Sequence, residues 1–238
     1  YAHLVVGFPD PLLHRARLWS TLAGLQRWQG PGGRKRPVTP RMLLWLLDFL
    51  RERSGLGAAD VSVLWCAIVV AFFFMLRASE YLVQAGRTWS LERVVRGKDL
   101  IGRDAANDPC ASFRDASEIV LHITSSKTDQ YNVGSVRNQY RTGAVLCPVE
   151  AVCGLEEHFP QRLRGSERDQ PLFRWASGEP IKREEVQHYL MVAGLASGLA
   201  SHEIGSHSLR IGGATAMYHA VDDSVSYTHL TLPTIRSV

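Results

Sequence analysis

Apolar residues recur at helical spacing over most of the chain, and the signals at helix ends divide it into segments. Thr39-Pro40 predicts a helix start, with threonine as N-cap and proline in the first turn, and this helix ends near Gly55. Its inward face should carry the apolar side chains at positions 42, 43, 46, 47, 49 and 50. The next helix should begin at Asp60 as its cap, run through 61–76 with apolar residues all round, and continue towards Gly86.

The period changes between residues 88 and 142. The stretch 118–125 is rich in β-branched residues and 133–141 forms a return strand after a polar turn, while 91–95 supplies a third strand and 102–117 a loop. Three further helices are predicted at 148–159, 182–195 and 207–220. The fold class is therefore α+β and mainly α, with a small antiparallel three-stranded sheet inserted after the second core helix.

Composition excludes several classes of protein. The chain has 238 residues, of which 45% are hydrophobic and 21% charged, which excludes a disordered or fibrous protein. Four cysteines without a Cys-x-x-Cys pair indicate neither a disulfide scaffold nor a zinc site, and favour a reducing intracellular compartment. The uncharged stretch 61–76 would be about 24 Å long as a helix, short of the ~30 Å hydrocarbon core of a membrane. We expect a buried helix there and no membrane partner.

Positive charge is concentrated near the N-terminus. The chain carries a formal charge of +4, and Arg34, Lys35 and Arg36 form a basic run in a Gly/Pro-rich stretch. Such a run is either a solvated linker or a contact to a polyanion such as DNA, and charge alone leaves both interpretations open.

Three places carry candidate chemistry. Arg77 ends the long apolar run, so its guanidinium should leave the core for a cleft or an ion pair, and Glu80 is placed to orient it. Lys127, one of four lysines, lies in the polar turn between two predicted strands. His207 and Arg210 share one face of a late helix, and Gly212-Gly213 then leaves bare backbone for a close approach. Each signal alone has an ordinary structural explanation: a helix-end ion pair for Arg77, a turn lysine for Lys127 and a solvated helix end for His207 and Arg210.

Taken in order, these motifs resemble the tyrosine recombinase (phage-type integrase) family. They are most similar to the recombinases of eukaryotic mobile elements. The matches are Leu76-Arg-Ala-Ser-Glu80, Ser126-Lys-Thr-Asp129, Cys147-Pro-Val-Glu-Ala151, His207-Ser-Leu-Arg-Ile-Gly-Gly-Ala-Thr215 and the entry segment Arg34-Lys-Arg-Pro-Val-Thr-Pro40. The resemblance covers about residues 34–224. It implies a catalytic domain that cleaves and rejoins double-stranded DNA through a phosphotyrosine, with copies that self-associate on DNA.

The resemblance also implies a role for each site residue. Arg77 and Arg210 would clamp the phosphate, supported by Glu80, because planar guanidinium groups suit its oxygens. Lys127 would protonate the leaving 5′-oxygen and His207 would handle the nucleophile's proton or bind the phosphate. Phosphotyrosine exchange conserves bond energy, so neither ATP nor a metal is implied. The location would be intracellular, and nuclear in a eukaryote.

The sequence departs from the family after Arg210. Only 28 residues follow, and 226–238 is interpreted as a non-native run-on tail. We therefore do not assign Tyr227 as the nucleophile or His229 as the second histidine of the site. We expect residues 1–33 to be a remnant of an N-terminal DNA-clamping domain and linker, and 34–225 to be a catalytic domain without its last helices and its nucleophile. The competing interpretations are a non-catalytic DNA-binding domain derived from a recombinase and, less well supported, a type IB topoisomerase-like domain.

Overall fold

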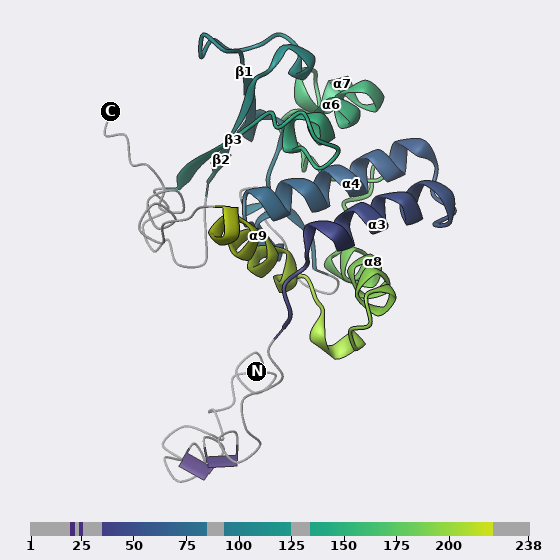
Figure 1. Cartoon of the computed structure of the whole chain (residues 1–238). Coiled ribbons are helices and arrows are strands. Elements are labelled where there is room, and N and C mark those ends of the chain that lie inside the picture. Colours follow the sequence, from purple (N-terminus) through teal and green to yellow (C-terminus); the bar gives the residue numbers. More distant parts are fainter. Residues whose placement is uncertain (1–19, 22–23, 26–34, 85–92, 125–133, 221–238) are drawn as a thin grey trace, which may run out of the picture. The chain divides into compact units, whose positions relative to one another are not determined.

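The computed structural model describes residues 20–21, 24–25, 35–84, 93–124 and 134–220. The chain divides into two compact units, residues 1–34 and 35–238. In the first unit the described residues are helical. The second unit contains the helices and the sheet on which the rest of the fold and the candidate site are built (Figure 1).

Helix α3 (Pro40–Glu52) begins where the sequence predicts. The Thr39 side chain accepts a hydrogen bond of 3.2 Å from the backbone N–H of Met42, which satisfies one of the free donors at the helix start. The buried face consists of Met42, Leu43, Leu46, Leu47 and Leu50. Phe49, expected inside, is only half-buried, because it stacks on Trp45 with ring centroids 5.4 Å apart at the edge of the core.

Helix α4 (Ala58–Phe73) is the centre of the domain. It is buried on nearly every side, as its apolar sequence predicts, and it packs against α3, α6 and α9. The predicted N-cap is wrong. The helix begins after Gly57, and Asp60 lies in its first turn, where its carboxylate accepts a 2.6 Å hydrogen bond from the backbone N–H of Ala176.

The predicted continuation of this helix through Arg77 is also wrong. Helix α4 ends at Phe73, and Met75 takes the left-handed conformation with φ of +51°. The N–H of Met75 then bonds to Phe72 O at 3.2 Å and the N–H of Leu76 to Ala71 O at 2.9 Å, the paired bonds of a Schellman turn. The chain leaves the core here, and a separate short helix, α5 (Ala78–Tyr81), follows.

The sheet is a three-stranded antiparallel meander in the order β1-β2-β3, as expected. Strands β2 (Glu118–Ile123) and β3 (Ser135–Tyr140) pair from Glu118 opposite Tyr140 to Ile123 opposite Ser135. The third strand is β1 (Leu100–Arg103) rather than the predicted 91–95. Gly102 and Arg103, at the start of the segment expected to be a loop, pair with β2. The described residues 93–95 form no strand.

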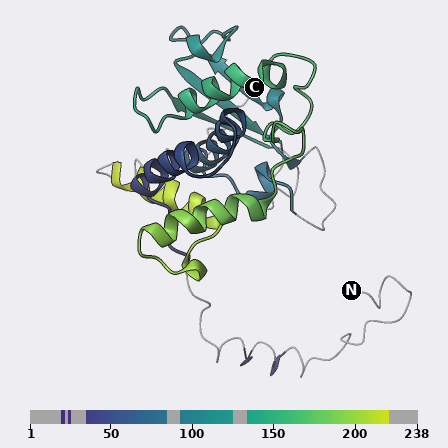
Figure 2. The same cartoon turned by 90° about the vertical axis from the view of Figure 1, so that its right-hand side faces the viewer.

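The remaining helices enclose α4. Helices α6 (Pro148–His158) and α7 (Pro160–Leu163) lie with the sheet on one side of α4, and α8 (Arg183–Ala196) and α9 (His207–Ala220) lie on the other (Figures 1 and 2). Short 3-10 helices are η2 (Gly97–Asp99), η3 (Phe113–Asp115) and η4 (Ser201–Glu203). Among the described residues, no helix combines the length and apolar character needed to cross a membrane.

Candidate active site

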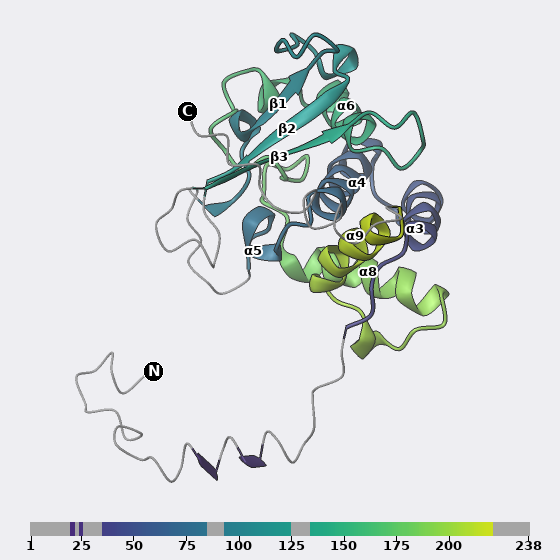
Figure 3. The same cartoon turned by 60° about the vertical axis from the view of Figure 1, so that its left-hand side comes forward.

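The end of α4 is where three distant segments meet. The last carbonyl groups of a helix have no partner within it, and the Schellman turn satisfies only some of them. Gln139 Nε2 donates to Phe73 O at 3.1 Å, a guanidinium N–H of Arg137 donates to Phe74 O, and Arg210 Nη1 donates to Met75 O at 2.7 Å. Side chains from β3 and α9 therefore converge on consecutive carbonyl groups of one turn. Figure 3 shows β3, α9 and α5 around this end of α4.

Arg77 leaves the core directly after this turn, as its sequence position predicts. Its Nη1 donates to Glu80 Oε1 at 3.0 Å, and its backbone N–H donates to Glu80 Oε2 at 2.8 Å. The Glu80 side chain is 3% exposed and that of Arg77 is 28% exposed. The buried carboxylate thus fixes the base of α5, and the guanidinium held by it still reaches solvent.

His207 and Arg210 lie on the first turns of α9 and line one open pocket of about 430 Å³ with Ile211, Thr215 and Tyr218. The helix approaches its neighbours closely through the two glycines. A Cβ on Gly212 would lie 2.0 Å from Val38 O, and one on Gly213 would lie 2.0 Å from Phe72 O. The close approach expected of these glycines is confirmed, and it brings Arg210 to the end of α4.

Arg137 belongs to the same cluster and was not singled out in the sequence. Burial lowers its pKa from the ordinary value for arginine, Glu80 opposes this shift, and the positive charges of Arg210 and Arg77 add to it. The charges of Arg77, Arg210 and Glu80 therefore all act on Arg137 at the end of α4. The only sequence signal was alternation in the strand, which places Arg137 and Gln139 on one face.

The other predicted site residues lie elsewhere or outside the description. Lys127 and Arg34 lie outside the described residues. Lys35 Nζ donates to His202 O at 2.6 Å and to Ile204 O at 3.2 Å, and Arg36 Nε lies 3.2 Å from Glu203 Oε1. Both residues are exposed, and these contacts attach the entry segment to the end of η4.

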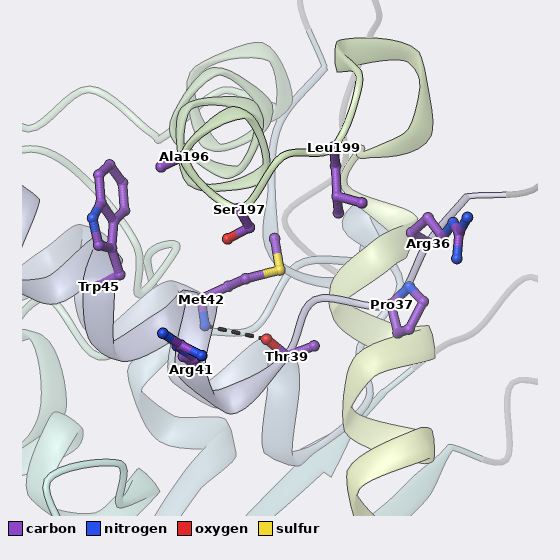
Figure 4. Close-up of a pocket in the computed structure, with 9 residues that line it drawn as sticks. All are labelled: Arg36, Pro37, Thr39, Arg41, Met42, Trp45, Ala196, Ser197 and Leu199. Atoms are coloured by element: carbon purple, nitrogen blue, oxygen red, sulfur yellow. Dashed lines mark hydrogen bonds between the residues drawn. The ribbon is translucent and has the colours of Figure 1, made fainter.

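A second pocket lies apart from the arginine cluster. It has a volume of about 590 Å³ and lies between the start of α3 and the end of α8, with Arg36 at one side and Trp45 and Met42 at the other (Figure 4). None of the three clustered arginines lines it. In the described part of the chain, no group of three or more His, Cys, Asp or Glu residues is arranged to hold a metal ion.

Sequence comparisons give no match, either to known protein families or to curated proteins. Comparison with solved structures does give matches. XerH site-specific recombinase bound to palindromic difH substrate, in a post-cleavage complex, is 14% identical with a TM-score of 0.53, and the match covers 82% of this chain and 46% of that one. The pre-cleavage complex with difH substrate is 16% identical with a TM-score of 0.52, covering 82% and 47%.

A third structure, the lambda integrase catalytic core, is 18% identical with a TM-score of 0.48, covering 86% of this chain and 94% of that one. The chain spans about half the length of the XerH structures. The fold match to both XerH structures covers 82% of this chain despite the low identity. The domain therefore has the tyrosine-recombinase fold that the order of its sequence motifs predicts.

Proposed function

We propose that this chain is the catalytic domain of a site-specific tyrosine recombinase, which cleaves and rejoins double-stranded DNA through a phosphotyrosine. The observation that carries the proposal is the placement of Arg77 and Arg210 beside the same turn, in this fold. Arg77 is held by Glu80 at 3.0 Å and Arg210 by Met75 O at 2.7 Å, so both guanidinium groups are fixed before substrate binds. Fixed donors stabilise developing charge without a cost of reorganisation.

In the proposed reaction the two guanidinium groups bind the non-bridging oxygens of the scissile phosphate. Their planar donors match phosphate geometry in pairs. His207, three residues before Arg210 and in the same pocket, binds the phosphate or takes the proton of the nucleophile. Lys127 protonates the leaving 5′-oxygen, a role taken from the family resemblance. Exchange between two duplexes also requires several copies of the chain to assemble on DNA.

Binding to duplex DNA at different salt concentrations tests the first part of this proposal. Each phosphate that a cation neutralises adds about 0.9 to the slope of log K against log salt. Arg210→Gln should lower that slope by about one and weaken binding about tenfold, as expected for one charge-assisted contact. Fluorescence anisotropy of a labelled duplex measures both quantities.

The matched control is Arg114→Gln. It removes the same charge from an exposed arginine, which pairs with Glu157 at 2.7 Å and is not among the charges that act on the cluster. This variant should bind as the wild type does. Absence of DNA binding at low salt, or equal losses in the two variants, would contradict the proposal.

We expect the 238-residue chain to bind DNA without forming a covalent adduct on a nicked suicide substrate. Tyr218 shares the pocket of Arg210 but lies eight residues along the same helix, about 12 Å of axial rise. A nucleophile must come within about 3–3.5 Å of the phosphorus that Arg210 holds. An adduct lost on Tyr218→Phe or on Tyr227→Phe would overturn this expectation and identify the nucleophile.

A further inference from the structure

Strand β3 presents Arg137 and Gln139 to the end of α4 and its apolar residues to solvent. Val136 and Tyr140 are 45% and 64% exposed, whereas Arg137 and Gln139 are half-buried and donate hydrogen bonds to carbonyl groups at the end of α4. This is the reverse of the usual arrangement, in which the apolar face of a strand covers the core. Burying an arginine here requires a reason that packing does not supply.

The hydrogen bonds show what Arg137 does to the turn. Arg137 donates to Phe74 O, and Arg210 donates to the next carbonyl group, Met75 O. Consecutive Cα atoms are about 3.8 Å apart, so the two guanidinium groups are anchored at neighbouring points. Arg77 follows two residues later. The three arginines are thus held by one short stretch of backbone.

Like charges act on Arg137 in this cluster. Among the described residues, the positive charges of Arg77 and Arg210 disfavour the charged form of Arg137, and Glu80 favours it. Arg137 Nε is also buried and has no hydrogen-bond partner among the described residues. Like charges and a buried unsatisfied donor both cost folding free energy, and an anion bound beside them would offset that cost.

We infer that Arg137 is a third cation of the phosphate site, a positioning residue that supports Arg77 and Arg210 and raises the affinity of the site for a phosphate group. The inference rests on the function proposed above and deepens it. One of its donors is already engaged by Phe74 O, so Arg137 acts on the phosphate through its charge and through the turn that carries the other two arginines.

Stabilisation by inorganic phosphate tests this inference without DNA. A ligand that binds only the folded state stabilises it by RT ln(1 + [L]/Kd), so melting curves in phosphate and in chloride at equal ionic strength give an apparent Kd. Arg137→Gln should raise this Kd about tenfold, and Arg137→Lys, which keeps the charge, should stay within about threefold of the wild type. Should Arg137→Gln fold poorly, Arg137→Met removes the charge and keeps the packing of the stem.

Arg141→Gln is the matched control. Arg141 directly follows β3, and its Nε and Nη2 donate to Ala116 O at 2.8 Å and Phe113 O at 2.9 Å, but it is not among the charges that act on Arg137. This variant should lose stability in chloride and keep the wild-type Kd for phosphate. Unchanged phosphate affinity in Arg137→Gln or Arg137→Met, or no phosphate effect in the wild type, would overturn the inference. The proposed function is judged separately, by duplex binding.

Discussion

Replacing Gly213 with alanine should separate α9 from the end of α4. Gly213 lies in the second turn of α9, and a Cβ at this position would be 2.0 Å from Phe72 O, 3.1 Å from Phe72 C and 3.2 Å from Met75 Cγ. Two of these atoms are backbone, so no side-chain rotation relieves the clash. Ordinary contacts of a Cβ begin near 3.4 Å, and the two helices must therefore move apart by more than an ångström.

The size of the effect follows from one stabilising and two destabilising contributions. Alanine is favoured over glycine inside a helix by about 1 kcal/mol. Overpacking of a well-packed interface costs about 1–3 kcal/mol. The movement also disrupts the 2.7 Å bond from Arg210 to Met75 O, a charged hydrogen bond that contributes about 1.5–3 kcal/mol. We expect Gly213→Ala to lower the free energy of unfolding by about 2–4 kcal/mol.

Urea unfolding followed by tryptophan fluorescence measures this difference by linear extrapolation. The control is Gly154→Ala in α6, where the added Cβ meets only Ser62 Oγ, at 3.5 Å. That variant should be unchanged or more stable by up to about 1 kcal/mol, because only the helix propensity acts. A Gly213→Ala protein as stable as the wild type would refute the close approach of α9 to α4, and with it the geometry of the arginine cluster.

Two further predictions concern the core. Ile68→Ala, at a fully buried position of α4, should lower the free energy of unfolding by about 2–5 kcal/mol. Val136→Ala, on the exposed face of β3, should lower it by less than about 1 kcal/mol. Equal losses of the two variants in urea unfolding would be inconsistent with the burial described. Burial, with a smaller contribution from Cys153, raises the pKa of the Cys66 thiol. The thiol therefore ionises at lower pH in the unfolded chain than in the folded one. The free energy of unfolding should fall above about pH 8.5, by up to about 1.4 kcal/mol per pH unit. Cys66→Val should flatten this alkaline slope in urea unfolding between pH 7.5 and 10, and an unchanged slope would exclude Cys66 as its source.

The helices were predictable because their signals are local. Thr39-Pro40 marks the start of α3, and the apolar surface of α4 indicates a central helix before any contact is known. The end of α4 was not predictable. The usual residue at the left-handed position of a Schellman turn is glycine, and here it is Met75. The turn is stabilised by partners 63 and 135 residues away along the chain, which no local pattern contains.

The sheet and the site show the same limit. The third strand was expected at 91–95 from its composition, but pairing with β2 selected Leu100–Arg103. Arg77, Glu80, His207 and Arg210 could be selected as candidates because each lies near a predicted helix end. Arg137 was not singled out, because the carbonyl group that it contacts, Phe74 O, lies 63 residues away along the chain.

The turn at the end of α4 also determines when the arginine cluster can form during folding. Contacts between residues far apart in sequence form late, because a long loop must be closed before they contribute any stabilisation. The bond from Arg210 to Met75 O spans 135 residues, so α9 can dock only after the sheet and α6 to α8 have been synthesised. A chain still emerging from the ribosome therefore cannot assemble the arginine cluster until α9 has been synthesised.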